Sequence, residues 1–172
     1  MSYIANCMRR WAVYIPIASM VILFASCTMP LQTVGRKALE PHQIALKTNQ
    51  EPAVWETKDL VISYTMEDLG DSFILAGTVK IDDRVTYSYP FAVTFNVYVS
   101  QLNGEGIATS RRDVGANASA YKRVPDGIVF KRRMEKSEDT EAIAFSYWGT
   151  FRESGGGIEA DELEIFYSPF ER

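Results

Sequence analysis

The sequence has little of the chemistry that most catalytic and metal sites need. Its 172 residues include one histidine and two cysteines. One histidine excludes a multi-histidine metal site, and two cysteines cannot build the disulfide framework of small secreted domains. His42 follows Pro41 in a segment that we expect to be a tether, where no partner would hold it as a general base. We therefore expect no enzyme activity, no cofactor and no metal site.

Strong positive charge is also lacking. The formal net charge is -4 and the isoelectric point is near 5.1. A nucleic-acid-binding domain is usually basic, so no nucleic-acid partner is expected. Hydrophobic residues make up 47% of the chain, which excludes a disordered protein. The length fits one domain, or one domain with a tail.

The N-terminal residues carry the pattern of a secretory signal peptide. Arg9 and Arg10 precede an apolar run, Trp11–Ala25, that contains no charged residue. The run ends in small residues and is shorter than the about 20 residues of a transmembrane helix. An uncleaved N-terminal membrane anchor remains the alternative, and Met8 is an alternative start of the chain.

The end of this run resembles the lipobox of bacterial lipoproteins. That pattern has an aliphatic residue, two small residues and an obligatory cysteine, and here the residues are Leu23-Phe24-Ala25-Ser26-Cys27. Phe24 departs from the usual leucine. The resemblance implies cleavage between Ser26 and Cys27, and a lipid anchor in the membrane on the Cys27 sulfur. Thr28 in place of aspartate implies the outer membrane, with the protein facing the periplasm. An incidental cysteine is the alternative.

These signals divide the chain into three parts. Residues 1–26 form the expected signal peptide, residues 27–55 the lipidated cysteine and a flexible tether, and residues 56–172 the folded domain. The tether is expected because proline and glycine stiffen or interrupt regular structure. The residues concerned are Pro30, Gly35, Pro41 and Pro52.

The folded part is predicted to be all-β. Phe91, Val93, Phe95, Val97 and Val99 alternate strictly with smaller or polar residues, as in a half-buried strand. Similar alternation recurs in several short runs separated by turn residues, including Asn103-Gly104. Six to eight such strands predict an antiparallel sandwich or barrel, and we favour a sandwich.

Three stretches of the domain resemble the immunoglobulin-like domains of the FxLYD and water-stress type. They are Ala76–Val79, Phe91–Val99 and Gly104–Ile107. The resemblance implies an immunoglobulin-like sandwich and no particular activity, because fold alone does not determine function.

Basic residues are the first candidate for a binding surface. They gather between positions 111 and 133 as Arg111, Arg112, Lys122, Arg123, Lys131, Arg132 and Arg133. Such a face suits anionic lipid head groups, an acidic protein partner or a polysaccharide. The alternative is a solvated face whose charges protect strand edges.

Aromatic residues are the second candidate. Strand alternation predicts that Tyr147 faces the core and that Trp148 points outward. Trp148 and the nearby Tyr147 are nevertheless the candidate residues of an aromatic platform, and packing of Trp148 under a loop or the tether is the alternative. Acidic turns are interpreted as solvated rather than calcium-binding. We therefore expect a lipid-anchored, periplasm-facing binding or structural module of the bacterial cell envelope with an envelope protein partner. The alternative is a small-ligand or glycan-binding lipoprotein.

Overall fold

Two antiparallel sheets make up the folded part of the protein. The computed structural model describes residues 33–48, 51–154 and 160–171, and nine strands lie within these ranges. The first sheet has the order β1 (Ile44–Ala45), β8 (Ala142–Arg152), β5 (Phe91–Leu102) and β6 (Ala108–Arg123), and β9 (Glu162–Tyr167) also pairs with β8. The second sheet has the order β2 (Ala53–Glu56), β3 (Leu60–Asp68), β4 (Ser72–Ile81) and β7 (Ile128–Glu135).

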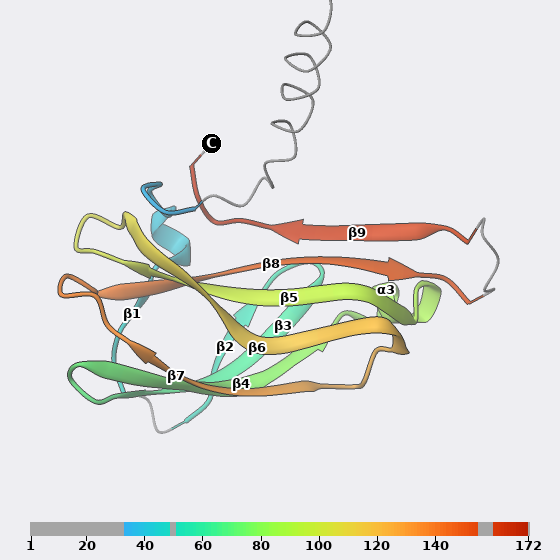
Figure 1. The fold of residues 1–172 in the computed structure, drawn as a ribbon, viewed down its shortest axis with the longest axis horizontal. Coiled ribbons are helices and arrows are strands. Elements are labelled where there is room, and N and C mark those ends of the chain that lie inside the picture. Colours follow the sequence, from blue (N-terminus) through green and yellow to red (C-terminus); the bar gives the residue numbers. More distant parts are fainter. Residues whose placement is uncertain (1–32, 49–50, 155–159, 172) are drawn as a thin grey trace, which may run out of the picture. The chain divides into compact units, whose positions relative to one another are not determined.

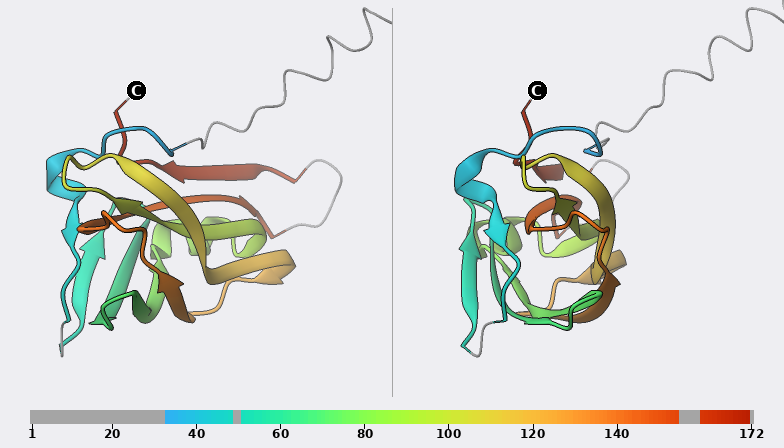
Figure 2. Two further views of the ribbon diagram at one scale, coloured as in Figure 1. Left: turned by 60° about the vertical axis from the view of Figure 1, so that its left-hand side comes forward. Right: turned by 90° about the vertical axis from the view of Figure 1, so that its left-hand side faces the viewer.

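The main core lies between the two sheets (Figures 1 and 2). Alternate residues of β3, such as Leu60 and Ile62, face alternate residues of β5 and β8, such as Phe95 and Phe145, and all four are fully buried. This is the period-two pattern that a sheet with one buried face requires. The predicted all-β antiparallel sandwich is confirmed.

The strongest alternating run contains an irregularity that its sequence hides. Phe95, Val97 and Val99 are fully buried, as expected. Phe91 and Val93 are only partly buried, and Ala92 lies in the core instead. The register of β5 shifts between Ala92 and Thr94 against both neighbouring strands, as it does at a β-bulge. The bulge reverses which residues face the core on its N-terminal side.

The expectation of a flexible tether over residues 27–55 is wrong for the part that the structure describes. The hydroxyl of Thr33 lies 3.3 Å from that of Ser100 on β5, in a buried contact. Gly35 N–H donates to the Ala108 carbonyl at 2.8 Å, and Ala38 N–H donates to the Gly106 carbonyl at 2.8 Å. The segment is therefore hydrogen-bonded to the sandwich from Thr33 onward.

Further along this segment, regular structure also forms before residue 56. A 3₁₀ turn, η2 (Glu40–His42), leads into β1, which pairs with the start of β8, and β2 begins at Ala53. The packed unit begins at Thr33 and continues to the C-terminal residues. The expected signal peptide, the cleavage site and Cys27 lie outside the described residues.

A second, smaller apolar cluster attaches this segment to the first sheet. It contains Ala38, Leu102, Ala108, Ala144 and Phe170. Leu102 follows Ser100 at a spacing of two, so both lie on the face of β5 opposite the main core. The N-terminal and C-terminal segments therefore cover one end of this face.

The opposite end of the sandwich carries the only α-helix in the described ranges. The helix α3 (Asp83–Ser88) connects β4 to β5, and the Asp82 side chain caps it by accepting from Arg84 N–H. The connection from β6 to β7 lies at the same end, because Arg123 pairs with Phe91. Through this connection the chain passes from the first sheet to the second. Both β6 and β7 are outer strands of their sheets.

Candidate functional site

Four of the predicted basic residues meet in one groove between the two outer strands. We call it the arginine groove, and its volume is about 550 Å³. Its lining comes from β5, β6 and β7 and consists of Gln101, Arg111, Arg112, Asp113, Arg132, Arg133, Met134 and Glu135. Four guanidinium groups and two carboxylates give it positive charge in a protein whose net charge is negative.

Two of these arginines stand where a core side chain would be expected. Arg112 is paired with Val99 and Arg132 with Leu75, and both partners are fully buried. Directly opposed residues share one face of a sheet, so both arginines lie on core-facing sides. Both are nevertheless exposed, because their strands are the outer ones and the core ends there.

Arg111 is fixed from the other side of β6. Its guanidinium carbon lies 3.6 Å from the centre of the Tyr98 ring, a cation–π contact. Burial lowers the pKa of Arg111 below its ordinary value, and the group stays charged because that value is so high. The stacking contact therefore restricts the conformation of this side chain and fixes the position of its charge.

The floor of the groove is held by a buried amide. Gln101, only 3% exposed, donates through Nε2 to the Glu135 carbonyl at 2.8 Å. Its Oε1 accepts from Ser137 N–H at 3.0 Å and from the Thr140 hydroxyl at 2.8 Å. These bonds join β5, the strand that pairs with β6, to the end of β7, and so connect the two arginine-bearing strands.

The carboxylates of the groove leave most of its cations unpaired. Within the described ranges, no carboxylate forms an ion pair with Arg112, Arg132 or Arg133. The Asp113 carboxylate accepts from Gly115 N–H at 2.6 Å, within the same strand. Arg133 Nε donates to the Ser72 hydroxyl at 3.1 Å, a neutral partner. The groove thus offers positive charge to a ligand.

The other predicted basic residues lie elsewhere. Lys131 is paired with Ala76 and lines a separate hollow with Thr65 and Glu67, so it does not join the arginine groove. Lys122 and Arg123 lie at the far end of β6, opposite Ala92 and Phe91. The sequence cluster between positions 111 and 133 is therefore three separate groups in the structure.

Tyr147 faces the core, as the alternation predicts, so its place in the predicted aromatic platform is wrong. Its side chain is fully buried, and its hydroxyl donates to Asp59 Oδ2 at 2.8 Å and lies 2.9 Å from the Thr57 hydroxyl. The ring stacks on Tyr167 with centroids 5.8 Å apart. Burial, more than any other cause, raises the pKa of Tyr147 far above its ordinary value. This tyrosine is a core residue, because it lies on the face of β8 that packs between the sheets.

Trp148 lies on the opposite face of β8 and is half-buried. Its indole N–H donates to Glu164 Oε1 on β9 at 3.0 Å, and its cross-strand neighbour Phe166 is 43% exposed. This side of the sheet therefore presents a small aromatic surface. Trp148 lines neither the arginine groove nor the hollow beside Lys131.

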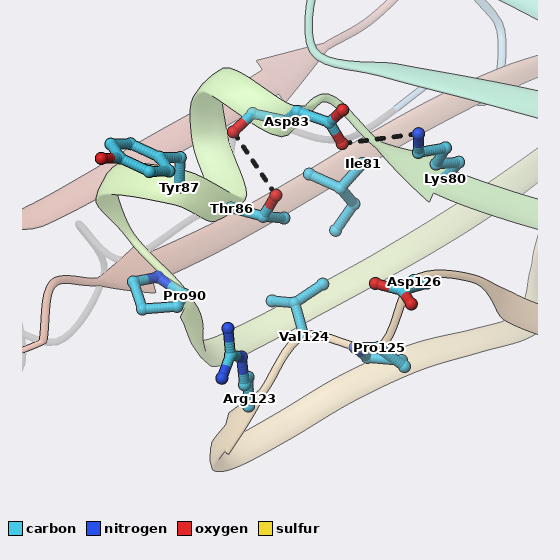
Figure 3. Close-up of a pocket in the computed structure, with 10 residues that line it drawn as sticks. All are labelled: Lys80, Ile81, Asp83, Thr86, Tyr87, Pro90, Arg123, Val124, Pro125 and Asp126. Carbon is cyan, nitrogen blue, oxygen red and sulfur yellow. Dashed lines mark hydrogen bonds and ion pairs between the residues drawn. The ribbon is translucent and has the colours of Figure 1, made fainter.

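A second hollow, of about 260 Å³, lies beside α3 at the far end of the sandwich (Figure 3). Lys80 and Asp83 form an ion pair of 3.4 Å on one side, and Arg123 and Asp126 stand across from them. Tyr87 at its rim is 91% exposed. Its two cations are matched by two carboxylates, so the hollow favours neither sign of charge.

The sequence pointed to the arginines but missed the residues that hold them. Tyr98, Gln101 and Glu135 position the groove, and none was singled out. The outward orientation of Tyr98 could have been predicted, because the alternation of β5 places it on the outer face, next to the strand that carries Arg111. Gln101 had none, since its partners are 34 to 39 residues away in the sequence.

Comparison with known proteins adds no family. No protein-family model matches the chain, and a search of the curated proteins finds no match either. Among the described residues, no helix has the length and apolar character needed to cross a membrane. The same residues contain no group of three or more His, Cys, Asp or Glu side chains placed to hold a metal ion.

Proposed function

We propose that the protein is a lipid-anchored, non-catalytic binding module of the bacterial cell envelope, held to a membrane through Cys27. The support for the anchor is the basic, apolar and small-residue order that ends at Cys27. By its resemblance to lipoproteins, the residue Thr28 favours the outer membrane and a domain facing the periplasm. An immunoglobulin-like class for the sandwich rests on resemblance in the same way.

The arginine groove is the observation that supports a binding role. Guanidinium groups recognise carboxylates and phosphates through paired, directional hydrogen bonds. Arg112 and Arg132 occupy core-facing positions of outer strands, and exposed strand edges are a common place for partners to dock. The ligand class that this groove fits is therefore anionic.

The chemistry available to the rest of the domain supports a role without catalysis. The single histidine, His42, packs edge-on against the Tyr167 ring with centroids 5.6 Å apart. That position makes it part of the packing around β9. A cysteine that carries a lipid is not available as a nucleophile.

A second candidate is a glycan-binding or small-ligand-binding lipoprotein. The half-buried Trp148 beside the exposed Phe166 favours it, because flat aromatic surfaces stack on sugar rings. Small-ligand sites are usually concave, whereas these two side chains lie on an open sheet face. The groove therefore ranks first.

Replacing Cys27 by serine tests the anchor, and the other cysteine provides a matched control. The wild type and Cys7→Ser are expected in the membrane fraction with a radiolabelled fatty acid attached. Cys27→Ser is expected to lose the label and to leave the processed membrane-bound pool. If Cys27→Ser kept its label, or fractionated and matured like the wild type, the lipoprotein proposal would be wrong.

A further inference from the structure

We infer that the arginine groove binds the phosphate groups of anionic lipids in the same membrane that carries the anchor. This inference rests on the proposed function and names the ligand class of its groove. The contact would hold the sandwich in one orientation on the membrane instead of leaving it free to turn on its lipid. Its basis is the position of the groove relative to the start of the packed unit.

The packed unit begins only six residues after Cys27. A fully extended chain spans at most about 3.6 Å per residue, so the Cys27 backbone lies within about 22 Å of Thr33. The 28-residue tether expected from the sequence would have allowed several times that reach. Hydrogen bonds at Thr33 and Gly35 set this shorter limit, because they hold the segment against β5 and β6.

The arginine groove lies beside that point of attachment. Thr33 contacts Ser100, and Ser100 is directly paired with Arg111, a lining residue of the groove. Paired residues of neighbouring strands have Cα atoms only about 5 Å apart. The four arginines therefore lie at the end of the sandwich to which Thr33 is attached, and a short lipid anchor would keep this end near the membrane (Figure 1 shows the first described residues, in blue, beside this end of β5 and β6).

The other basic pair is far from this end. Lys122 and Arg123 pair with Ala92 and Phe91, at the opposite end of β5 from Ser100. At about 3.3 Å per residue, this separation is about 30 Å along the strand. The two basic groups thus differ in distance from the anchor while sharing one strand, which makes Lys122 and Arg123 a matched control.

The charge of the groove fits a lipid phosphate. Arg112 and Arg132 have no carboxylate partner in the described part of the chain, and Arg111 is held rigid on Tyr98. The whole chain carries a net charge of -4, so an anionic membrane repels it except where cations gather. The anchor raises the local concentration of lipid head groups at the groove and so adds to a contact that the groove makes by itself.

Vesicle co-sedimentation of residues 28–172 tests the inference without the anchor. This part contains every described strand and both apolar clusters, and it lacks the apolar N-terminal run and Cys27. The probes are vesicles of phosphatidylcholine alone and vesicles with about one quarter phosphatidylglycerol. We expect binding only to the anionic vesicles, and its loss near 1 M salt, where the Debye length falls to about 3 Å.

Two double variants locate the binding surface. Each basic residue near an anionic membrane contributes about 1 kcal/mol, or about fivefold in affinity. Arg112→Gln/Arg132→Gln is therefore expected to weaken binding about 25-fold. Lys122→Gln/Arg123→Gln is expected to change it less than twofold. Both pairs are exposed, and thermal melts of the two variants check that the fold survives.

The outcomes separate this inference from the proposed function. Equal binding of the wild type to both vesicle types, no binding to either, or equal losses in the two double variants would overturn the lipid inference. Binding to polyglutamate in place of vesicles would also overturn it and would assign the groove to an acidic protein. Self-association of Arg112→Gln/Arg132→Gln with unchanged vesicle binding would overturn it as well and would show that the arginines protect the strand edges. None of these results touches the lipid on Cys27, which the fatty-acid labelling tests separately.

Discussion

Replacing Tyr147 by phenylalanine removes one buried hydroxyl and nothing else. That hydroxyl donates to Asp59 Oδ2 at 2.8 Å and lies 2.9 Å from the Thr57 hydroxyl. Tyr147 is fully buried and Asp59 is 9% exposed, so water cannot easily replace the lost donor. A hydrogen bond to a charged group contributes about 1.5–3 kcal/mol. We expect Tyr147→Phe to lower the free energy of unfolding by about 2 kcal/mol.

Tyr87→Phe is the matched control, because it removes the same hydroxyl from a side chain that is 91% exposed. An exposed substitution of this kind is expected to stay within about 0.5 kcal/mol of the wild type. Urea unfolding curves of the three proteins measure both effects. A Tyr147→Phe protein as stable as Tyr87→Phe would show that the hydroxyl is not held in the core. The assignment of Tyr147 to packing and not to ligand binding would then be wrong.

Two further predictions concern the core. Phe95→Ala is expected to lower the free energy of unfolding by about 3–5 kcal/mol, since the fully buried ring packs on Phe151 with centroids 5.8 Å apart. Thr94→Ala is expected to lower it by about 1 kcal/mol or less, because it loses only a 3.3 Å hydrogen bond from Asn96. Denaturant melts decide between them, and a larger loss from Thr94→Ala would place the strand in the opposite register. Stability should also fall as the pH rises above about 10, where tyrosines of the unfolded chain ionise, because burial raises the pKa of Tyr147 in the folded state. Tyr147→Phe should lose stability less steeply over that range in melts at increasing pH, and an unchanged slope would contradict the buried phenol.

The part of the fold that follows from local pattern could be predicted from the sequence. The apolar alternation of β5 gave its central residues and their burial correctly, and Asn103-Gly104 marked the turn that follows. The bulge beside Ala92 could not be predicted, because nothing in the residues themselves distinguishes it from continued alternation. Its register is set by two neighbouring strands that are distant in sequence.

The longest of the described strands shows no clear pattern in the sequence. β6 covers Ala108–Arg123, and its core-facing residues include only a few small side chains, such as Val114 and Ala116. Charged and small residues dominate the rest, so neither alternation nor β-propensity is visible. It is held by pairing with β5, an interaction between strands that a local pattern does not record.

Only part of the candidate site could be predicted, because pairing between distant strands decides which basic residues meet. The sequence brought Arg111 and Arg112 together with Arg132 and Arg133, but it also included Lys131, which lines a separate hollow further along β7. The extent of the tether was overestimated because proline and glycine signal irregular backbone, which is not the same as freedom from contacts. Thr33 and the residues after it are irregular and yet well packed.

We propose that a lipid on Cys27, at most about 22 Å from the packed unit, holds this protein to a membrane. The mass spectrum of the N-terminal peptide of the mature protein, purified from the membrane fraction of its host, shows whether that lipid is present. We predict that this peptide begins at Cys27 and has the added mass of acyl chains on that residue. A mature N-terminus at any other residue, or an unmodified Cys27, would show that the protein is not a lipoprotein anchored at this cysteine.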